Sequence, residues 1–266
     1  MLKSFFDGEF IEFFSVLPYS RCKVIRPDIM EREKFSPVSV IVYLVPYYTG
    51  EAVNISKYAI SRDYHIYIKE LNERLGAFLE KRFPENSFKG YGDSSPIDER
   101  RVAISLGLGI RGENGLLINE KYGSYVFIGE MITDIPTELL GNPEIRDEIS
   151  CKKCARCKNA CPTGRLKSKE NPCLSDITQR KGTLTEEEIN LMRKCGTVWG
   201  CDLCQSVCPY NKTAEITPIE FFLQDRIAYL TDETLSSMNE ADFRERAYSW
   251  RGRKTVERNL GYIKKG

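Results

Sequence analysis

The chain has 266 residues, of which 41% are hydrophobic, and its formal net charge at pH 7 is +1. This length is sufficient for one large domain or for two smaller domains with their own hydrophobic cores. The balanced charge excludes a protein that is basic or acidic throughout, so any charge-driven partner must contact a local patch.

The first twenty residues, MLKSFFDGEFIEFFSVLPYS, are rich in phenylalanine but interrupted by Asp7, Glu9 and Glu12. Their apolar residues recur at the spacing of an amphipathic helix. They lack the uninterrupted apolar core and the cleavage site of a signal peptide. No stretch of about 18 apolar residues predicts a transmembrane helix. We therefore expect a cytoplasmic protein without a membrane partner.

Residues 1–148 show alternating strand and helix patterns. The near-continuous apolar and β-branched run at 38–48 predicts a buried strand. Residues 61–83 have helical periodicity, with one apolar face made of Tyr64, Ile68, Leu71, Leu75, Phe78 and Leu79. Residues 97–109 predict a second helix, and 115–133 predict two strands joined by a turn at Lys121–Gly123. The expected fold is mixed α/β, a sheet with helices packed on it.

The segment GDSSPIDER, which precedes the second helix, contains the first catalytic candidate, Asp93. Ser95 is the expected N-cap, with Pro96 as the first helical residue and Asp98 at the third position. Asp93 would then lie on a strand-to-helix loop, where catalytic groups often occur. The alternative is a turn-forming aspartate that is hydrogen-bonded to its own backbone. Further on, three glycines in GIRGENGLLIN give only a weak indication of an anion-binding loop.

Residues 149–212 form a cysteine-rich segment that predicts a small domain held together by metal sites. Eight of the ten cysteines lie between Cys151 and Cys208. In CKKCARCKNACP, the spacing C-x2-C-x2-C-x3-C-P is that of bacterial ferredoxins. A zinc ribbon would show paired C-x2-C knuckles instead. The motif therefore favours an iron–sulfur cluster, whose cysteines here are Cys151, Cys154, Cys157 and Cys161.

The second motif, WGCDLCQSVCPYNK, contains only Cys201, Cys204 and Cys208, and Val198 occupies the position of the first cysteine. Spacing alone leaves either Cys195 or Cys173 as the missing ligand. In ferredoxins the last cysteine of each motif binds the other cluster. One cluster would then be bound by Cys151, Cys154, Cys157 and Cys208, and the other by Cys161, Cys201, Cys204 and one of the two candidates.

Residues 213–266 predict a helical C-terminal extension. Its last part is basic, and either a solvated helix face or a phosphate-contacting patch could explain the excess of positive charge. The basic residues are Arg244, Arg246, Arg251, Arg253, Lys254, Arg258, Lys264 and Lys265.

With these motifs in view, the chain resembles epoxyqueuosine reductases, cobalamin-dependent iron–sulfur enzymes of tRNA modification. The similar segments include SRDYHIYIKELNERL, GSYVFIGEMITD, CKKCARCKNACPTGRL and NPCLSDITQRKG, and together they cover about residues 40–212. The resemblance implies an α/β cobalamin-binding domain at 1–148, a ferredoxin-like domain with two [4Fe-4S] clusters at 149–212, and a helical tail at 213–266. Long members continue into helical repeats that help bind tRNA, whereas 58 residues follow Cys208 here.

The resemblance also implies roles for individual residues. Asp93 matches the proton donor, and Cys173 rather than Cys195 matches the remaining cluster ligand. The other residues that it places near the cofactor or the tRNA are Gly112, Asn114, Ser175, Gln179 and Asp202. His65 is the only histidine, and the D-x-H-x-x-G motif that supplies a cobalt ligand in many cobalamin proteins is absent. His65 is therefore expected to pack or to contact a corrinoid side chain.

The implied activity is the reduction of epoxyqueuosine at the tRNA wobble position to queuosine, by a monomer supplied by an unidentified electron donor. Two other interpretations stay open. One is a corrinoid iron–sulfur reductase of the same architecture with another substrate, such as an organohalide or a small epoxide. The other is an electron carrier or a corrinoid-activating protein without a substrate of its own.

Overall fold

The computed structural model describes residues 1–264, so Lys265 of the basic run lies outside the described residues. The chain forms two compact units. Unit 1 comprises Met1–Pro46 and His65–Lys152, and unit 2 comprises Tyr47–Tyr64 and Lys153–Gly266. Within the described part of the chain, no helix is both long enough and apolar enough to cross a membrane.

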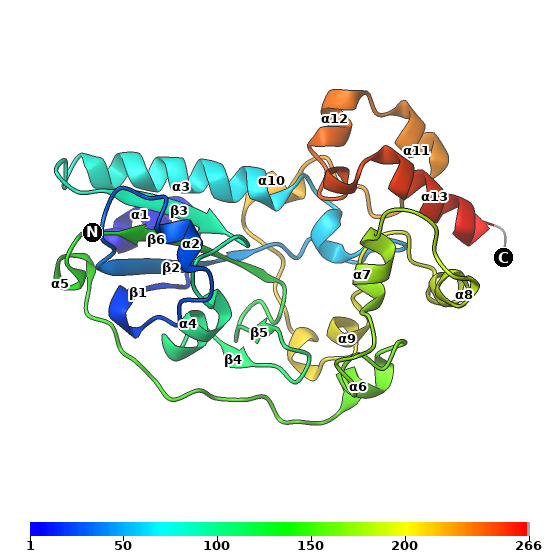
Figure 1. The fold of residues 1–266 in the computed structure, drawn as a ribbon, viewed down its shortest axis with the longest axis horizontal. Helices are drawn as coiled ribbons and strands as arrows, with labels where there is room; N and C mark the ends of the chain where they lie inside the picture. Colours follow the sequence, from blue (N-terminus) through cyan, green and yellow to red (C-terminus); the bar gives the residue numbers. More distant parts are fainter. Residues whose placement is uncertain (265–266) are drawn as a thin grey trace. The chain divides into compact units, whose positions relative to one another are not determined.

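Unit 1 is an antiparallel sheet with helices on both faces (Figure 1). The strand order is β1-β2-β6-β3, and a separate two-stranded ribbon is formed by β4 and β5. Its main elements are α1 (Leu2–Gly8), β1 (Phe14–Pro18), α2 (Pro27–Met30), β2 (Ser39–Pro46), α3 (Tyr64–Glu80), β3 (Phe88–Gly92), α4 (Glu99–Ser105), β4 (Ile110–Arg111), β5 (Leu117–Ile118), β6 (Val126–Thr133) and α5 (Thr137–Leu140). The predicted mixed α/β class is confirmed.

The centre of this sheet is β2, in which all eight residues are buried. It pairs with β1 on one side and with β6 on the other, for example through Val42, which faces Ser15 and Glu130. A strand that is covered on both faces needs apolar side chains at every position. The continuous apolar run at 38–48 therefore predicted this strand correctly.

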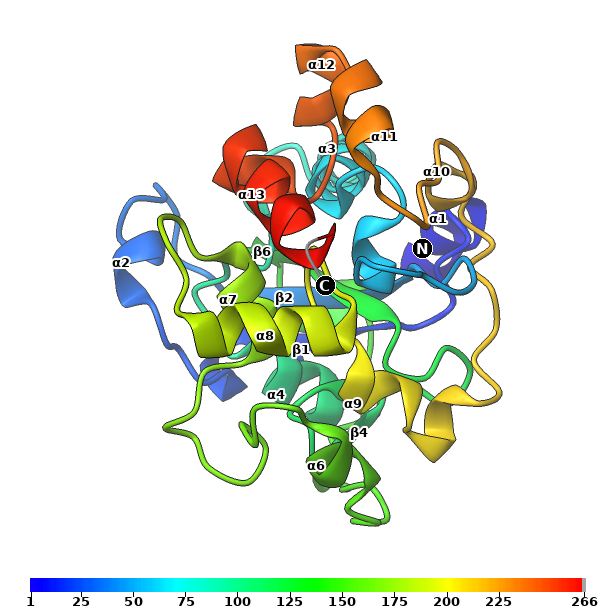
Figure 2. The same ribbon diagram turned by 90° about the vertical axis from the view of Figure 1, so that its right-hand side faces the viewer.

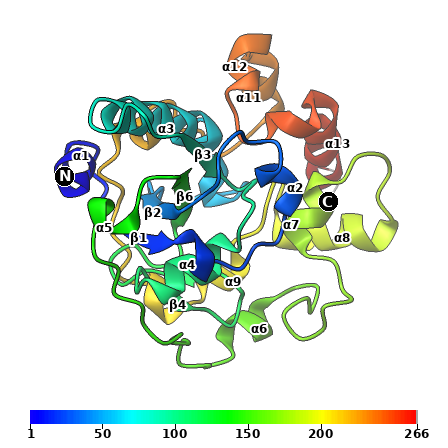
Figure 3. The ribbon, with the colours of Figure 1, turned by 60° about the vertical axis from the view of Figure 1, so that its left-hand side comes forward.

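The two faces of the sheet are covered by α3 and α4, which lie on opposite sides (Figure 3). Along α3, Tyr64, Ile68, Leu71, Leu75 and Leu79 are buried as the periodicity predicted, whereas Phe78 is only half-buried. The helix α4 packs on β2 and β6, and its Val102 lies in the same core as Val42 and Ile132. Side chains on one strand alternate between the two faces, so each helix covers a different set of strand residues.

The helix expected over residues 1–20 is wrong beyond Gly8. Phe10 adopts a positive φ of 57°, which ends the helical path, and Phe14–Pro18 forms the edge strand β1. The backbone of β2 needs hydrogen-bond partners on this side. Pairing with β2 thus overrides the local helical pattern.

The predicted N-cap of α4 is also wrong, because the helix begins at Glu99 and its N-cap is Asp98. The Asp98 carboxylate accepts a hydrogen bond from the backbone N–H of Arg101 (3.2 Å). Ser95 instead accepts one from the N–H of Ile97 (3.0 Å), whose side chain is buried in the core. The Pro96 carbonyl accepts N–H groups from another segment, so residues 95–97 stay outside the helix.

Unit 2 is built from short helices around two small cores, and residues 47–64 contribute to one of them. Trp199 and Tyr248 are fully buried there together with Ile55 and Ile60. In Figure 2, α7 and α8 lie side by side and α13 lies against α8, as their contacts require. The predicted helical extension after residue 212 is confirmed. The helices are α6 (Arg156–Ala160), α7 (Leu174–Gln179), α8 (Glu186–Cys195), α9 (Leu203–Ser206), α10 (Glu220–Leu223), α11 (Asp232–Ser237), α12 (Glu240–Arg244) and α13 (Arg253–Lys264).

Candidate functional site

Asp93 lies immediately after β3, on the loop that leads to α4. Its backbone φ is 67°, a left-handed conformation that aspartate and asparagine tolerate better than most residues. Its side chain is 59% exposed, and Oδ2 lies 3.6 Å from Nε2 of His65. The loop therefore presents a carboxyl group on the surface of unit 1.

His65 approaches Asp93 from the first turn of α3. The packing or corrinoid contact that was expected for it stays a prediction. Beside it, a groove of about 580 Å³ runs between α3 and β3, with His65, Ile68 and Asn72 on the helix side and Gly90 and Gly92 on the strand side. The structure thus adds a neighbour of Asp93 that the sequence did not suggest.

Two further carboxyl groups near Asp93 were missed by the sequence analysis. Burial raises the pKa of Glu130 to about 8, although the nearby Ser95 hydroxyl acts in the opposite direction. Burial also raises the pKa of Glu99 to about 7, and the negative charge of Asp93 adds to the effect. A sequence signal existed for Glu130, because a glutamate interrupts the otherwise apolar strand VFIGEMIT.

The loop that carries Gly112 and Asn114 joins β4 to β5. A Cβ atom on Gly112 would lie only 2.3 Å from Oδ1 of Asn114, so a larger residue there would displace the Asn114 side chain. Oδ1 accepts a hydrogen bond from the N–H of Leu116 (3.3 Å). Nδ2 of Asn114 is buried and has no partner among the described residues. The loop therefore holds an unused hydrogen-bond donor, which is the feature expected where a polar ligand docks.

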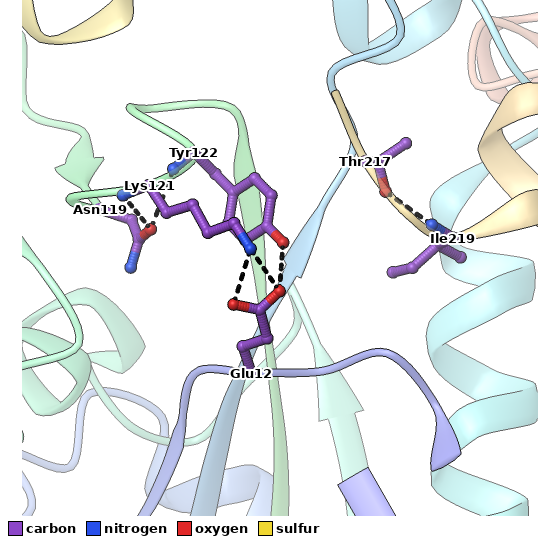
Figure 4. A network of polar contacts seen from close by, with 6 residues as sticks. All are labelled: Glu12, Asn119, Lys121, Tyr122, Thr217 and Ile219. Carbon is purple, nitrogen blue, oxygen red and sulfur yellow. Dashed lines mark hydrogen bonds and ion pairs between the residues drawn. The ribbon is translucent and has the colours of Figure 1, made fainter. Parts of the chain in front are cut away.

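The end of this loop region is fixed by a polar network in unit 1 (Figure 4). The side-chain oxygen of Asn119 accepts hydrogen bonds from the N–H groups of Lys121 and Tyr122, each 3.0 Å long. The Lys121 ammonium and the Tyr122 hydroxyl both donate to Glu12 (2.6 and 2.9 Å). The network stabilises the predicted turn before β6. In the same figure, Thr217 accepts the N–H of Ile219 within unit 2.

Cys151, the first cysteine of the cluster motifs, is anchored in unit 1 by the same loop. The N–H of Cys151 donates to the carbonyl of Arg111 (2.9 Å). The N–H of Glu113 donates to the Cys151 sulfur (3.4 Å), and such N–H groups stabilise a thiolate ligand. Thus one loop holds Gly112, Asn114 and a candidate cluster ligand.

The rest of the first motif lies in unit 2, where Lys153 and Ala155 both have positive φ values, of 53° and 61°. Successive N–H groups in such turns form concave anion sites, as in many iron–sulfur proteins. For Cys161, burial acts against ionisation, but hydrogen bonds from Thr163 and from neighbouring backbone groups lower its pKa overall. These features suit a loop that carries thiolates.

The second motif packs against the first through α9 and α6, which are neighbours in unit 2. Burial raises the pKa of Cys201 to about 12, and both Cys173 and Cys195 lie close enough to add to the effect. The ligand role of Cys173 therefore stays a prediction. None of the ten cysteines, all of which are in described residues, forms a disulfide.

The three other predicted contact residues have internal partners in unit 2. The Gln179 amide donates to the Ser175 hydroxyl one turn earlier on α7 (3.0 Å). Asp202 is half-buried and accepts hydrogen bonds from the Ser56 hydroxyl, from the N–H of Lys57 (2.6 Å) and from the Gln205 amide (3.1 Å). Asp202 thus links residues 56–57 to the second cysteine motif, and its cofactor contact stays a prediction.

Much of the C-terminal basic run also has internal partners in unit 2. Arg246 is buried and donates to the carbonyl of Asp225, and Arg258 donates to the carbonyl of Gly182. Arg244 pairs with Glu240 (3.1 Å). These contacts favour a structural use of several of these charges over a continuous phosphate-contacting patch.

Two family models match the chain. Residues 34–94 match the model described as epoxyqueuosine reductase QueG, DUF1730. Residues 150–211 match the model of the 4Fe-4S double cluster binding domain. The cysteine-rich segment is therefore a 4Fe-4S double-cluster domain, as the motif spacing predicted.

Similar proteins agree with these matches. An epoxyqueuosine reductase from Listeria monocytogenes is 37% identical over 74% of this chain and 53% of its own length, so the chain spans about half of that relative. One from Cyclobacterium marinum is 31% identical over 85% of this chain and 76% of its own length. A solved epoxyqueuosine reductase with an epoxyqueuosine-modified tRNA stem loop has the same fold, with a TM-score of 0.81 and 24% identity over 98% of this chain and 79% of that one. The sequence matches show that the chain belongs to the epoxyqueuosine reductase family.

Proposed function

We propose that this chain is a cobalamin-dependent reductase that converts epoxyqueuosine in tRNA to queuosine. The observation that carries the proposal is that one chain joins the epoxyqueuosine reductase segment to a double-cluster domain. The relative solved with a modified tRNA stem loop suggests the same class of substrate. Because several matched relatives are about twice as long as the aligned region, activity, substrate and partners are proposals for this chain.

In this proposal the double-cluster domain relays electrons one at a time. The adjacent helices α6 and α9 each carry one cysteine of a motif, Cys157 and Cys204. The left-handed turns at Lys153 and Ala155 expose N–H groups where the cluster carries negative charge. One cluster is assigned to Cys151, Cys154, Cys157 and Cys208, and the other to Cys161, Cys173, Cys201 and Cys204.

Cobalamin is proposed as the electron acceptor of the clusters. A corrin ring carries peripheral amides, whose carbonyl oxygens need hydrogen-bond donors. The buried and unpartnered Nδ2 of Asn114 is such a donor, so the residues present fit the cofactor. Gly112 allows the Asn114 side chain to fold back against the loop. When bound, reduced cobalamin would supply the low-potential electrons that open the epoxide.

Asp93 is proposed to protonate the epoxide oxygen. Its carboxyl group is largely exposed at the end of β3. A general acid must lie within hydrogen-bond reach of the atom that it protonates, and an exposed loop position allows this. Contact with a bound corrinoid and substrate would remove water from Asp93 and favour its protonated form.

The proposed reaction also implies a cellular compartment and an electron donor. Because the proposed substrate is tRNA, we place the protein in the cytoplasm. Electrons must reach the clusters from a reductant, and we propose a separate donor protein. The monomeric state expected from the sequence stays a prediction.

The test is anaerobic reconstitution of the whole chain with iron, sulfide and cobalamin, followed by assay on three substrates. We expect queuosine to form in tRNA that carries epoxyqueuosine, with no turnover of a small epoxide or a haloarene. Turnover of the small substrates alone would identify a reductase with another substrate. A reducible cobalt without turnover of any substrate would contradict the proposal.

A further inference from the structure

A buried carboxyl group in unit 1, Glu130, has no role in the function proposed above. It lies in the middle of β6, is fully buried, and points to the face covered by α4, as Ile128 and Ile132 do. Neither of its carboxyl oxygens has a hydrogen bond of good geometry among the described residues. An ionised carboxylate without a partner is strongly disfavoured in such a place, so Glu130 is held as the acid.

Glu99 interacts electrostatically with both Asp93 and Glu130 in unit 1. It is the first residue of α4, and its Oε2 atom is also buried without a partner. The negative charge of Asp93 acts on Glu99, and that of Glu99 acts on Glu130. The Ser95 hydroxyl approaches Glu130 from the same loop that carries Asp93. In the sheet register Glu130 faces Tyr91, which lies two residues before Asp93, and α4, which begins at Glu99, packs on β6.

Burial favours the protonated forms of Glu99 and Glu130 near neutral pH, and the neighbouring charges modify this effect. Burial is the main cause that raises the pKa of Glu99 to about 7 and that of Glu130 to about 8. On α4, the positive charge of Arg100 opposes the shift of Glu99 and the negative charge of Asp98 adds to it. The other titratable groups that interact with these carboxyls are Tyr19, Cys22, Tyr43 and Tyr91 around Glu130, and His65 at Asp93.

The proposed reaction needs more than one proton. Removal of the epoxide oxygen as water, with formation of the alkene, consumes two electrons and two protons. Asp93 can carry only one proton. We propose that Glu99, with Glu130 behind it, supplies the second proton through Asp93. This inference rests on the proposed function, and in it Glu99 is a positioning residue because it acts through Asp93.

Each turnover uses two protons and two electrons. Asp93 gives its proton to the epoxide oxygen as the first C–O bond breaks, and becomes a carboxylate. Glu99 then transfers its proton to Asp93, which delivers it to the same oxygen as the second C–O bond breaks and water leaves. The two electrons come from the reductant through the cluster domain. Glu99 regains a proton from Glu130 or from solvent before the next turnover.

The first test needs no substrate. Infrared titration of the anaerobic holoprotein should show a protonated carboxyl band that is lost as the pH rises through about 7. Glu99→Gln should remove this band, while Asp98→Asn, which keeps an effective N-cap, should leave it. A spectrum that is unchanged in Glu99→Gln would overturn the inference.

The second test is a single turnover with pre-reduced holoprotein and tRNA that carries epoxyqueuosine. A positioned acid is worth roughly 10²–10⁴-fold in rate, so Glu99→Gln should slow queuosine formation at least about tenfold and abolish the decline in rate above pH 7. Glu99→Asp should restore part of the rate, and melting temperatures should confirm that both variants are folded. A wild-type rate and pH profile in Glu99→Gln would overturn only the proton supply, whereas an inactive wild-type protein would overturn the proposed function itself.

Discussion

At the scale of single residues, the site depends on where carboxyl groups lie relative to water. Asp93 is exposed at the end of β3, whereas Glu130 is enclosed in the sheet core. The carboxyl group of Asp93 can therefore meet a ligand at the surface, whereas burial keeps the carboxyl group of Glu130 protonated. The burial of Glu130 has a direct consequence for the stability of the protein.

Glu130→Gln should make the stability of the protein less dependent on pH. The pKa of Glu130 is about 8 in the folded state, against about 4.3 in an unfolded chain. The folded state then binds one more proton at Glu130 between these values, so the contribution of Glu130 to stability is greatest below about pH 4 and falls as the pH rises towards 8, by up to about 1.4 kcal/mol per pH unit. Glutamine is neutral throughout and should remove this loss.

The measurement is a series of thermal melts of the anaerobic holoprotein at pH 5, 6, 7 and 8. The advantage of Glu130→Gln over the wild type should grow with pH, while Glu120→Gln, at an exposed position, should follow the wild type. A constant difference between Glu130→Gln and the wild type across the series would show that Glu130 does not titrate in this range.

The sequence predicted the loop position of Asp93, which the structure confirms, but not the residues around it. A strand followed by GDSSPIDER places Asp93 on a loop, whichever residue caps the helix. The burial of Glu99 and Glu130 depends on packing between α4 and strands that are far apart in sequence. Local pattern cannot give the pKa values that result from such packing. The approach of His65 to Asp93 is a contact of the same kind.

At the scale of elements, α13 stabilises the region that precedes the second cysteine motif. Asn259 on α13 is fully buried. Its amide donates to the carbonyl of Thr178 at 2.7 Å and to that of Val198 at 2.8 Å. One side chain therefore ties α7, the segment before Cys201 and the C-terminal helix together.

Asn259→Ala should destabilise unit 2 by roughly 2–4 kcal/mol, because two buried carbonyl groups lose their donor. We expect a lower melting temperature and faster loss of iron on mild heating under anaerobic conditions. Asn190→Ala, on the exposed side of α8, is the matched control and should change stability little. Equal behaviour of the two variants would refute this role of α13.

The two candidates for the fourth ligand of the second cluster, Cys173 and Cys195, lie at the ends of neighbouring helices. Cys173 is the N-cap of α7 and Cys195 is the last residue of α8, and both influence Cys201. Cys173→Ala should lose one cluster, about half of the iron of a two-cluster protein. Cys195→Ala should retain all of it. Iron and sulfide analysis after anaerobic purification decides between them, and the opposite result would assign the ligand to Cys195.

Elements with a clear hydrophobic pattern could be predicted from the sequence. The edge strand β1, which forms by pairing with a distant strand, could not. The apolar run of β2 and the periodic face of α3 each indicate one structure by themselves. The segment Phe14–Pro18 has a helical pattern but becomes a strand, because it completes the edge of β2. Such pairing depends on a partner strand more than twenty residues away.

At the scale of the whole molecule, the chain does not divide at one point. Tyr47–Tyr64 belongs to unit 2, although unit 1 precedes and follows it in the sequence. Ile55 pairs with Trp199 in a parallel bridge, and Asp202 accepts hydrogen bonds from Ser56 and Lys57. Composition along the chain gives no sign of such a crossing. The predicted domain boundaries stay predictions.

The most direct test of the central claim measures queuosine formation by the anaerobic holoprotein in three forms. The wild type and Asp98→Asn should convert tRNA that carries epoxyqueuosine. Asp93→Asn should be slower by roughly 10²–10⁴-fold while its iron and cobalamin contents stay unchanged. Asparagine also tolerates the left-handed backbone at this position, so folding should be preserved. A wild-type rate in Asp93→Asn, or no conversion by a wild-type protein whose cobalt can be reduced, would contradict the account.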